Sequence, residues 1–209
     1  NRIPMLMLCG DTFLTRLPDP VLQQMENFSD PTYGVNDAFK PVCRYWDRIT
    51  HPAQVIQSLP NAIATLLDPA HCGPAFIGLP QDVQGWTYEY PTIFFEKKIH
   101  RIRRQTPDIN EIQDAANILS SAKRPMIIAG GGVQYSKATE QLKTFAEKHQ
   151  IPVVETIAGR ANLKDDHDLN IGPIGVTGSD SANNIAEKAD VILAVGTRLQ
   201  DFTTGSWTA

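Results

Sequence analysis

The chain has 209 residues, of which 42% are hydrophobic and 20% are charged, and its formal net charge at pH 7 is -4. This composition is typical of a globular protein with one large or two small domains, and the charge gives no reason to expect nucleic acid or an anionic membrane as a partner. No apolar run reaches the roughly 20 residues that span a bilayer, and no secretion signal is recognised, so we expect a cytoplasmic protein.

Two apolar runs in the first half predict buried β-strands. Residues 3–9 are mostly apolar and are followed by the turn pair Gly10-Asp11. Residues 76–79 form the second run, and prolines bound it on both sides, as is usual where strand pairing ends. Residues 15–41 show little periodicity and predict a long irregular connection, which in a compact domain is often functional.

A helix is predicted over residues 52–67. Val55, Leu59, Ile63, Leu66 and Leu67 share one face at helical spacing. Pro60 interrupts this pattern, which predicts a kink or a late start of the helix.

Residues 86–107 have no clear period and combine aromatic side chains with five cations, namely Lys97, Lys98, Arg101, Arg103 and Arg104. Such a stretch is either an anion site or a solvated linker between two domains. We favour the linker, because clustered charge is typical of a soluble connection.

The second half alternates strands with helices. Strands are predicted at residues 126–129, 151–154 and 191–195, and helices over residues 109–119, 138–146 and 182–189. Asp108 and Ser136 are the predicted N-caps of the first two helices. This alternation is typical of right-handed crossovers and a parallel sheet covered on both faces. We therefore predict an α/β fold with parallel sheets flanked by helices, as two Rossmann-like units in series.

Gly130, Gly131 and Gly132 follow a predicted strand, where a dinucleotide-binding unit has its phosphate loop. The third glycine of that pattern is replaced by Tyr135, so we favour a tight structural turn over a nucleotide site. The glycine-rich residues 172–178 are equally compatible with a ligand loop and with a turn that leads into the next helix.

Arg198 and Asp201 follow the strand at residues 191–195, a favourable location for ligand contacts, although a local contact at a helix start is the preferred interpretation. Arg44 either holds a substrate oxygen or packs its stem on Trp46, and the sequence does not separate these roles. The three cysteines and five histidines show no metal-ligand spacing, so we expect reduced structural thiols and no metal site.

Three motifs in order resemble the thiamine-diphosphate-dependent enzymes related to acetolactate synthase. Gly73–Val83 is similar to the last strand of their pyrimidine-binding domain. Arg124–Gly132 is similar to the opening of their central domain, and Gly196–Asp201 to the end of a later strand in it.

Within that family, residues 10–13, 18–24 and 36–49 are similar to the hydrolases that open a cyclic 1,2-diketone in myo-inositol breakdown. The resemblance implies thiamine diphosphate and Mg²⁺ as cofactors, the cyclic diketone as a small-molecule substrate, 5-deoxy-glucuronic acid as the product, and a homodimer or homotetramer. In that family thiamine diphosphate supplies the carbon that adds to the ketone.

The resemblance also divides the chain. Residues 1–85 would be the C-terminal half of the pyrimidine-binding domain, residues 86–107 the linker, and residues 108–209 a truncated central domain. Asp37, Phe39 and Arg44 are then candidates for the substrate pocket. Gly130, Gly131, Gly132 and Arg198 are weaker candidates for contacts to a cofactor.

By the same resemblance, the catalytic glutamate precedes Asn1 and the stretch that holds magnesium and diphosphate follows Ala209. We therefore expect no catalytic residue within these 209 residues, and neither activity nor bound cofactor for the chain alone. The alternatives are a carboligase like acetolactate synthase, a nucleotide- or FAD-binding module, and a purely structural module.

Overall fold

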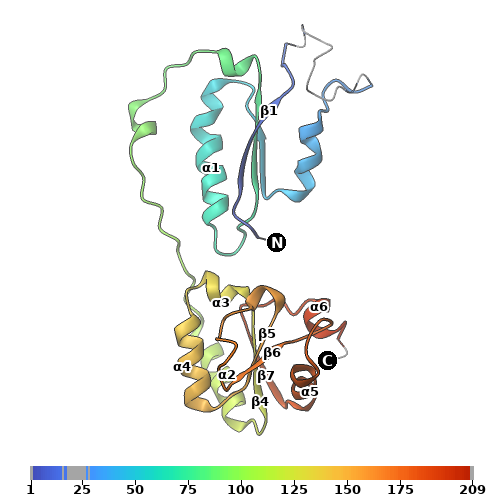
Figure 1. Cartoon of the computed structure of the whole chain (residues 1–209). Coiled ribbons are helices and arrows are strands. Elements are labelled where there is room, and N and C mark those ends of the chain that lie inside the picture. Colours follow the sequence, from blue (N-terminus) through green and yellow to red (C-terminus); the bar gives the residue numbers. More distant parts are fainter. Residues whose placement is uncertain (1, 16, 18–26, 28, 208–209) are drawn as a thin grey trace. The chain divides into compact units, whose positions relative to one another are not determined.

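The computed structural model describes residues 2–15, 17, 27 and 29–207, which form two compact units, Asn1–Thr106 and Pro107–Ala209. Each unit contains its own parallel sheet, with helices that connect the strands (Figure 1). The predicted α/β fold with two sheets in series is confirmed.

The first unit is built on three parallel strands, β1 (Leu6–Asp11), β2 (Tyr45–Arg48) and β3 (Ala75–Pro80), in the order β1-β3-β2. The central strand β3 is the most apolar of the three and is almost completely buried, as expected for a strand with neighbours on both sides. Helix α1 (Val55–Leu67) covers one face of the sheet, and the 3₁₀ segment η1 (Val35–Val42) lies on the other side of the strands (Figure 1).

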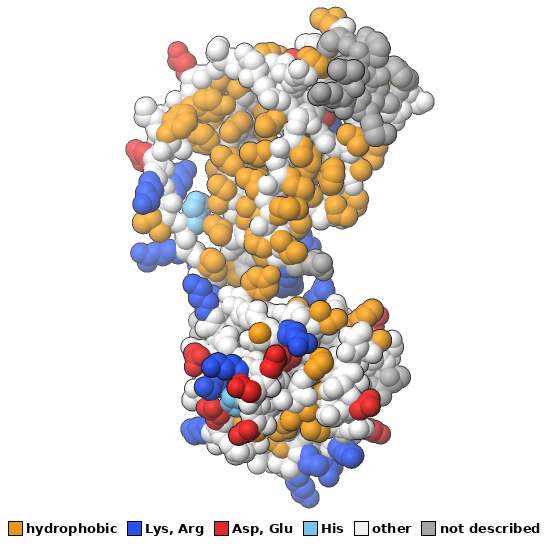
Figure 2. All heavy atoms as spheres, in the orientation of Figure 1, with side chains coloured by type: hydrophobic (Ala, Val, Ile, Leu, Met, Phe, Trp, Pro, Cys, Tyr) orange, Lys and Arg blue, Asp and Glu red, His pale blue; other side chains and the backbone are white. Residues whose placement is uncertain are grey.

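Short 3₁₀ turns complete the first unit at Pro52–Gln54, Val83–Gly85 and Thr92–Phe95. Strand β1 is at the edge of the sheet, and its Leu8 and the preceding Met5 are exposed. Figure 2 shows an area of apolar side chains on this unit.

The second unit contains β4 (Pro125–Ala129), β5 (Val153–Glu155), β6 (Asn170–Pro173) and β7 (Val191–Val195), all parallel and in the order β6-β5-β4-β7. The helices are α2 (Ile109–Ser121), α3 (Gly131–Tyr135), α4 (Thr139–His149), α5 (Asp180–Lys188) and α6 (Asp201–Thr204), with a 3₁₀ turn at Ile157–Gly159.

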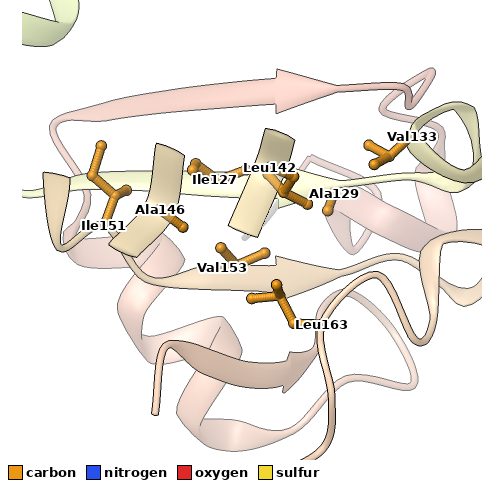
Figure 3. Packing of buried hydrophobic residues seen from close by; sticks show 8 residues of the cluster. All are labelled: Ile127, Ala129, Val133, Leu142, Ala146, Ile151, Val153 and Leu163. Atoms are coloured by element: carbon orange, nitrogen blue, oxygen red, sulfur yellow. The ribbon is translucent and has the colours of Figure 1, made fainter. Parts of the chain in front are cut away.

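Two apolar layers hold the second sheet between its helices. On one face, Ile127, Ala129 and Val153 pack against Leu142 and Ala146 of α4, together with Val133, Ile151 and Leu163 (Figure 3). On the other face, the alternate strand residues Met126, Ile128 and Val154 pack against Ala182 and Ala186 of α5. This alternation is the period-two pattern of a strand that is covered on both faces.

Several local predictions need correction. Residues 15–41 are not irregular throughout, because η1 begins at Val35, and strands β2 and β6 were not predicted. Ser136 does not cap α4; it follows α3, and α4 begins at Thr139 after Ala138. Helix α1 begins at Val55 and continues through Pro60, so the late start is wrong. The similarity at residues 18–24 lies outside the described residues.

Candidate functional site

The carboxyl ends of β1 and β2 carry a group of charged side chains that are bonded to one another. Asp11 ends β1 and Arg48 ends β2, and both strands pair with β3, where Arg48 lies opposite Gly78. In parallel sheets all strands end at one edge, and ligands of open α/β sheets bind outside that edge. The position therefore makes this group the first candidate for a functional site.

Arg48 links two buried carboxylates. Its Nε donates to Asp11 Oδ2 at 2.6 Å and its Nη2 donates to Asp37 Oδ2 at 2.8 Å. Asp11 is only 2% exposed and Asp37 only 3%. Buried carboxylates require such partners, because desolvation of an unpaired charge is very costly. Burial by itself would lower the pKa of Arg48, but the interactions with Asp11 and Asp37 outweigh it and raise the pKa.

Gly78 of β3 provides the space for the Asp11 carboxylate. A Cβ at this position would lie 2.7 Å from Asp11 Oδ2. Any larger residue would therefore have to displace the carboxylate from Arg48. Position 78 must therefore remain glycine if Asp11 is to keep its hydrogen bonds to Arg48.

Asp37 connects η1 to this group. Burial alone would raise the pKa of Asp37, but hydrogen bonds from Lys40, Arg48 and the backbone N–H of Gly34 outweigh it and lower the pKa to about 2. Lys40 Nζ lies 2.6 Å from Asp37 Oδ1, and the Gly34 N–H donates to Oδ2 at 2.8 Å. The carboxylate is therefore charged at neutral pH and has partners on both oxygens.

Neutral contacts fix the rest of η1 on the sheet. Asn36 Nδ2 donates to the carbonyl of Gly10 at 2.7 Å, and Trp46 Nε1 donates to the carbonyl of Asn36 at 3.0 Å. The rings of Phe39 and Trp46 both stack on buried Phe76, with centroid distances of 5.3 and 5.9 Å. Together these contacts define what we call the η1 cluster: Asp11, Asp37, Phe39, Lys40, Trp46 and Arg48.

The predicted pocket residues fall into two groups. Asp37 and Phe39 belong to the η1 cluster, where Asp37 is bonded within the protein and Phe39 is 38% exposed. Arg44 is exposed and precedes β2, at the strand end opposite to Arg48; its stem lies against Gly73, where a Cβ would be 2.4 Å from Arg44 Cγ. The structure does not bring Arg44 together with Asp37.

Sequence reasoning did not single out Asp11, Lys40 or Arg48. The available signals were the turn pair Gly10-Asp11 after an apolar run and the family resemblance of residues 10–13 and 36–49, neither of which assigned a role to these side chains. The position of Arg48 at a strand end could not be predicted, because strand β2 was not predicted.

The glycine turn of the second unit has a packing role. A Cβ at Gly130 would lie 2.2 Å from the carbonyl oxygen of Gly196, and one at Gly132 would lie 2.6 Å from the Gly196 Cα. The N–H groups of Gly130 and Gly132 donate to the carbonyls of Val195 and Gly196, each at 2.9 Å. These glycines let the turn approach the end of β7, and two of their three amides already have backbone partners.

The two other candidates of this unit, the glycine-rich residues 172–178 and Arg198, have hydrogen-bond partners close by in the chain. Ser179 accepts from the Ala182 N–H and caps α5, and Asn183 bonds both backbone groups of Gly175, so residues 172–178 lead into this helix. Arg198 Nη2 donates to the side chain of Gln200 at 3.0 Å, next to the start of α6 at Asp201.

Glu155, the last residue of β5, and Asn162, in the loop that follows, are both buried. The Glu155 carboxylate accepts from the N–H groups of Ala161 and Leu163, and Asn162 Nδ2 donates to the Gly130 carbonyl at 3.0 Å. Asn162 Oδ1 has no hydrogen-bond partner among the described residues. These bonds tie the loop after β5 to the glycine turn.

Within the described ranges, no three His, Cys, Asp or Glu side chains are grouped so that they could hold a metal ion. Cys9, Cys43 and Cys72 are free thiols, and burial raises the pKa of Cys43. None of the described helices combines the length and the hydropathy of a membrane span.

Comparison with known proteins gives two findings. Residues 112–209 match the family described as thiamine pyrophosphate enzyme, central domain. Over 206 residues the chain is 52% identical to a 3D-(3,5/4)-trihydroxycyclohexane-1,2-dione hydrolase of Clostridium perfringens and 52% identical to one of Clostridium tetani. It is 48% identical to one of Geobacillus thermodenitrificans. Each match covers 99% of this chain and 32% of the relative, so the chain spans about a third of the relatives' length.

Proposed function

Because residues 112–209 belong to the central-domain family of thiamine pyrophosphate enzymes, we propose that the protein hydrolyses a carbon–carbon bond of a cyclic 1,2-dione with this cofactor. The observation that carries the proposal is the 52% identity to dione hydrolases over 99% of the chain. The similarity therefore includes the first unit with its η1 cluster, and is not limited to the central domain.

The proposed reaction adds one water molecule across the bond between the two carbonyl carbons. That bond breaks, the hydroxyl group of water completes a carboxylic acid on one carbon, and hydrogen is added to the other carbon. When bound, thiamine diphosphate supplies the nucleophilic carbon and the electron acceptor that such a cleavage needs. The product is a linear sugar acid, which we propose to be 5-deoxy-glucuronic acid.

The described residues do not fit an anchor for the diphosphate and its metal ion. They contain no group of metal-ligating side chains, and the amides of Gly130 and Gly132 are bonded within the chain. We propose that thiamine diphosphate and Mg²⁺ are held by residues beyond these 209, in a cytoplasmic homodimer or homotetramer. The role proposed for this chain is to shape the substrate side of the site through the η1 cluster.

The cofactor requirement is tested on the complete gene product that carries these residues. The protein is freed of cofactor, and consumption of the dione is measured before and after thiamine diphosphate and Mg²⁺ are returned. We expect consumption only after both are returned. A rate that is independent of thiamine diphosphate would contradict the proposal, and condensation of pyruvate in the same assay would favour the carboligase alternative.

A further inference from the structure

Lys40 differs from the other charged residues of the η1 cluster in its exposure. Its side chain is 51% exposed, whereas the side chain of Arg48 is 19% exposed and that of Asp37 only 2%. The cluster thus has a buried part, Asp11, Asp37 and Arg48, and one cation on η1, Lys40, that reaches solvent.

The Lys40 ammonium is held in place by groups that are themselves fixed. It lies 2.6 Å from Asp37 Oδ1 and 4.3 Å from the centre of the Trp46 ring. Asp37 is bonded to Arg48 and to the backbone of Gly34, and Trp46 is stacked on buried Phe76. A free lysine side chain loses up to about 2 kcal/mol of conformational free energy when it is ordered by a ligand. In the folded chain the Lys40 side chain is already largely ordered by Asp37 and Trp46, so a ligand would have to supply less of this free energy.

The ammonium group retains donor capacity. It has three N–H donors; among the described residues one donor is used for Asp37, and the Trp46 ring faces the cation. Phe39, one residue earlier in η1, is 38% exposed, and its ring stacks on Phe76, as the Trp46 ring does. A fixed cation next to an apolar ring is suited to a ligand with oxygen atoms on a carbon ring.

We propose that Lys40 binds a carbonyl oxygen of the cyclic dione and so determines specificity for this substrate. This inference rests on the proposed function, because it takes the ligand from it. A trihydroxycyclohexane-dione carries two adjacent carbonyl and three hydroxyl oxygens and no charged group, so its recognition requires hydrogen-bond donors. Of the cations in the η1 cluster, Arg48 is committed to two carboxylates, and Lys40 is the one at the surface.

The competing explanation is that Lys40 only neutralises Asp37. Both explanations predict a lower melting temperature when the charge is removed, because Asp37 would lose a partner in a buried group. They differ in the Michaelis constant for the dione, which changes only if Lys40 contacts the substrate.

The test compares Lys40→Met, Lys40→Gln and Lys40→Arg with the wild type in the complete gene product. We expect the methionine and glutamine variants to lose about 10- to 100-fold in kcat/KM, mainly through KM, as for the loss of one charge-assisted hydrogen bond. The arginine variant should recover most of this loss. Lys143→Met is the matched control, since Lys143 is an exposed lysine in a 4.0 Å pair with Glu147 on α4, and it should leave KM unchanged.

The outcomes separate the two proposals. An active wild type with unchanged KM in Lys40→Met and Lys40→Gln overturns the inference on Lys40 alone. If one of these variants does not fold, the other and Lys40→Arg still report KM. A wild type that neither binds nor consumes the dione overturns the proposed function and this inference with it.

Discussion

Asp37 is a buried carboxylate whose ionisation contributes to the stability of the first unit. Its carboxylate is buried, and its folded-state pKa of about 2 lies below the ordinary value of 3.8. The unfolded chain therefore binds this proton more tightly than the folded chain. The stabilisation by Asp37 is fully present above about pH 4 and is lost as the pH falls from about 4 to about 2.

We expect Asp37→Asn to lower the free energy of unfolding at pH 7 by about 2 kcal/mol or more, since the neutral amide leaves Arg48 and Lys40 without this carboxylate. The variant should also show a weaker loss of stability than the wild type between pH 4 and pH 2. Urea unfolding followed by circular dichroism measures both effects. Glu89→Gln, at an exposed position of the same unit, is the control and should change stability by less than about 0.5 kcal/mol at pH 7. Parallel pH curves for Asp37→Asn and wild type would show that the pKa assignment is wrong.

Gly130 provides a second prediction for a single residue. A Cβ there would lie 2.2 Å from the Gly196 carbonyl, so Gly130→Ala should destabilise the second unit by about 2 kcal/mol or more through overpacking. Gly85→Ala is the control, because a Cβ at Gly85 meets no atom within 4 Å. Chemical denaturation of the two variants measures the difference. If Gly130→Ala were as stable as Gly85→Ala, the space at the turn would be open and a phosphate cradle would regain support.

The residue-level predictions from sequence depended on local patterns in the chain. The favoured tight turn at residues 130–132 is in fact the start of helix α3, which begins at Gly131 and packs on Gly196, and Arg198 is bonded to Gln200 next to the start of α6. The η1 cluster was only partly predictable. Asp11 and Arg48 are 37 positions apart in the chain, and nothing local indicates that two strand ends meet.

At the level of elements, α1 contains an unusual feature. Pro60 lies inside the helix, where proline has no N–H to donate to the carbonyl four residues earlier. The sequence pattern therefore suggested a kink or a late start of the helix. Packing of its apolar residues on the sheet, with Ala62 fully buried, outweighs the missing hydrogen bond.

Pro60→Ala should therefore stabilise the first unit, by about 1–2 kcal/mol, because alanine restores the helical donor and has a higher helix propensity. Pro52→Ala is the matched control. Pro52 is at the first position of a 3₁₀ turn, where the missing N–H is not needed, and it is buried, so no gain is expected there. Thermal unfolding of both variants tests this. A loss of stability in Pro60→Ala would mean that the proline ring contributes more by packing than it costs.

The elements that sequence reasoning missed are short. Strand β2 has four residues with half-buried aromatic and charged side chains, and β6 has four residues with a register shift in its pairing to β5. Neither has the apolar run or the alternation that predicts a strand. Long amphipathic helices and fully buried strands, such as α4 and β4, were predictable because burial imposes a period on the sequence.

In the whole molecule, this chain and the rest of the complete gene product are expected to have different roles. The 209-residue chain alone should show no saturable binding of thiamine diphosphate and Mg²⁺ in titration calorimetry, because its described residues offer no group of metal ligands. The complete gene product should bind both. Saturable binding by the chain alone would show that anchoring residues are present within it.

The most direct test of the proposed function is the product that the complete gene product forms from trihydroxycyclohexane-1,2-dione. With thiamine diphosphate and Mg²⁺ present, mass spectrometry should show a compound heavier than the dione by one water molecule, and titration should show one carboxylic acid for each dione consumed. Without the cofactor the dione should persist. A product without the added water, a condensation product, or unchanged dione in the presence of both cofactors would contradict the assignment as a dione hydrolase.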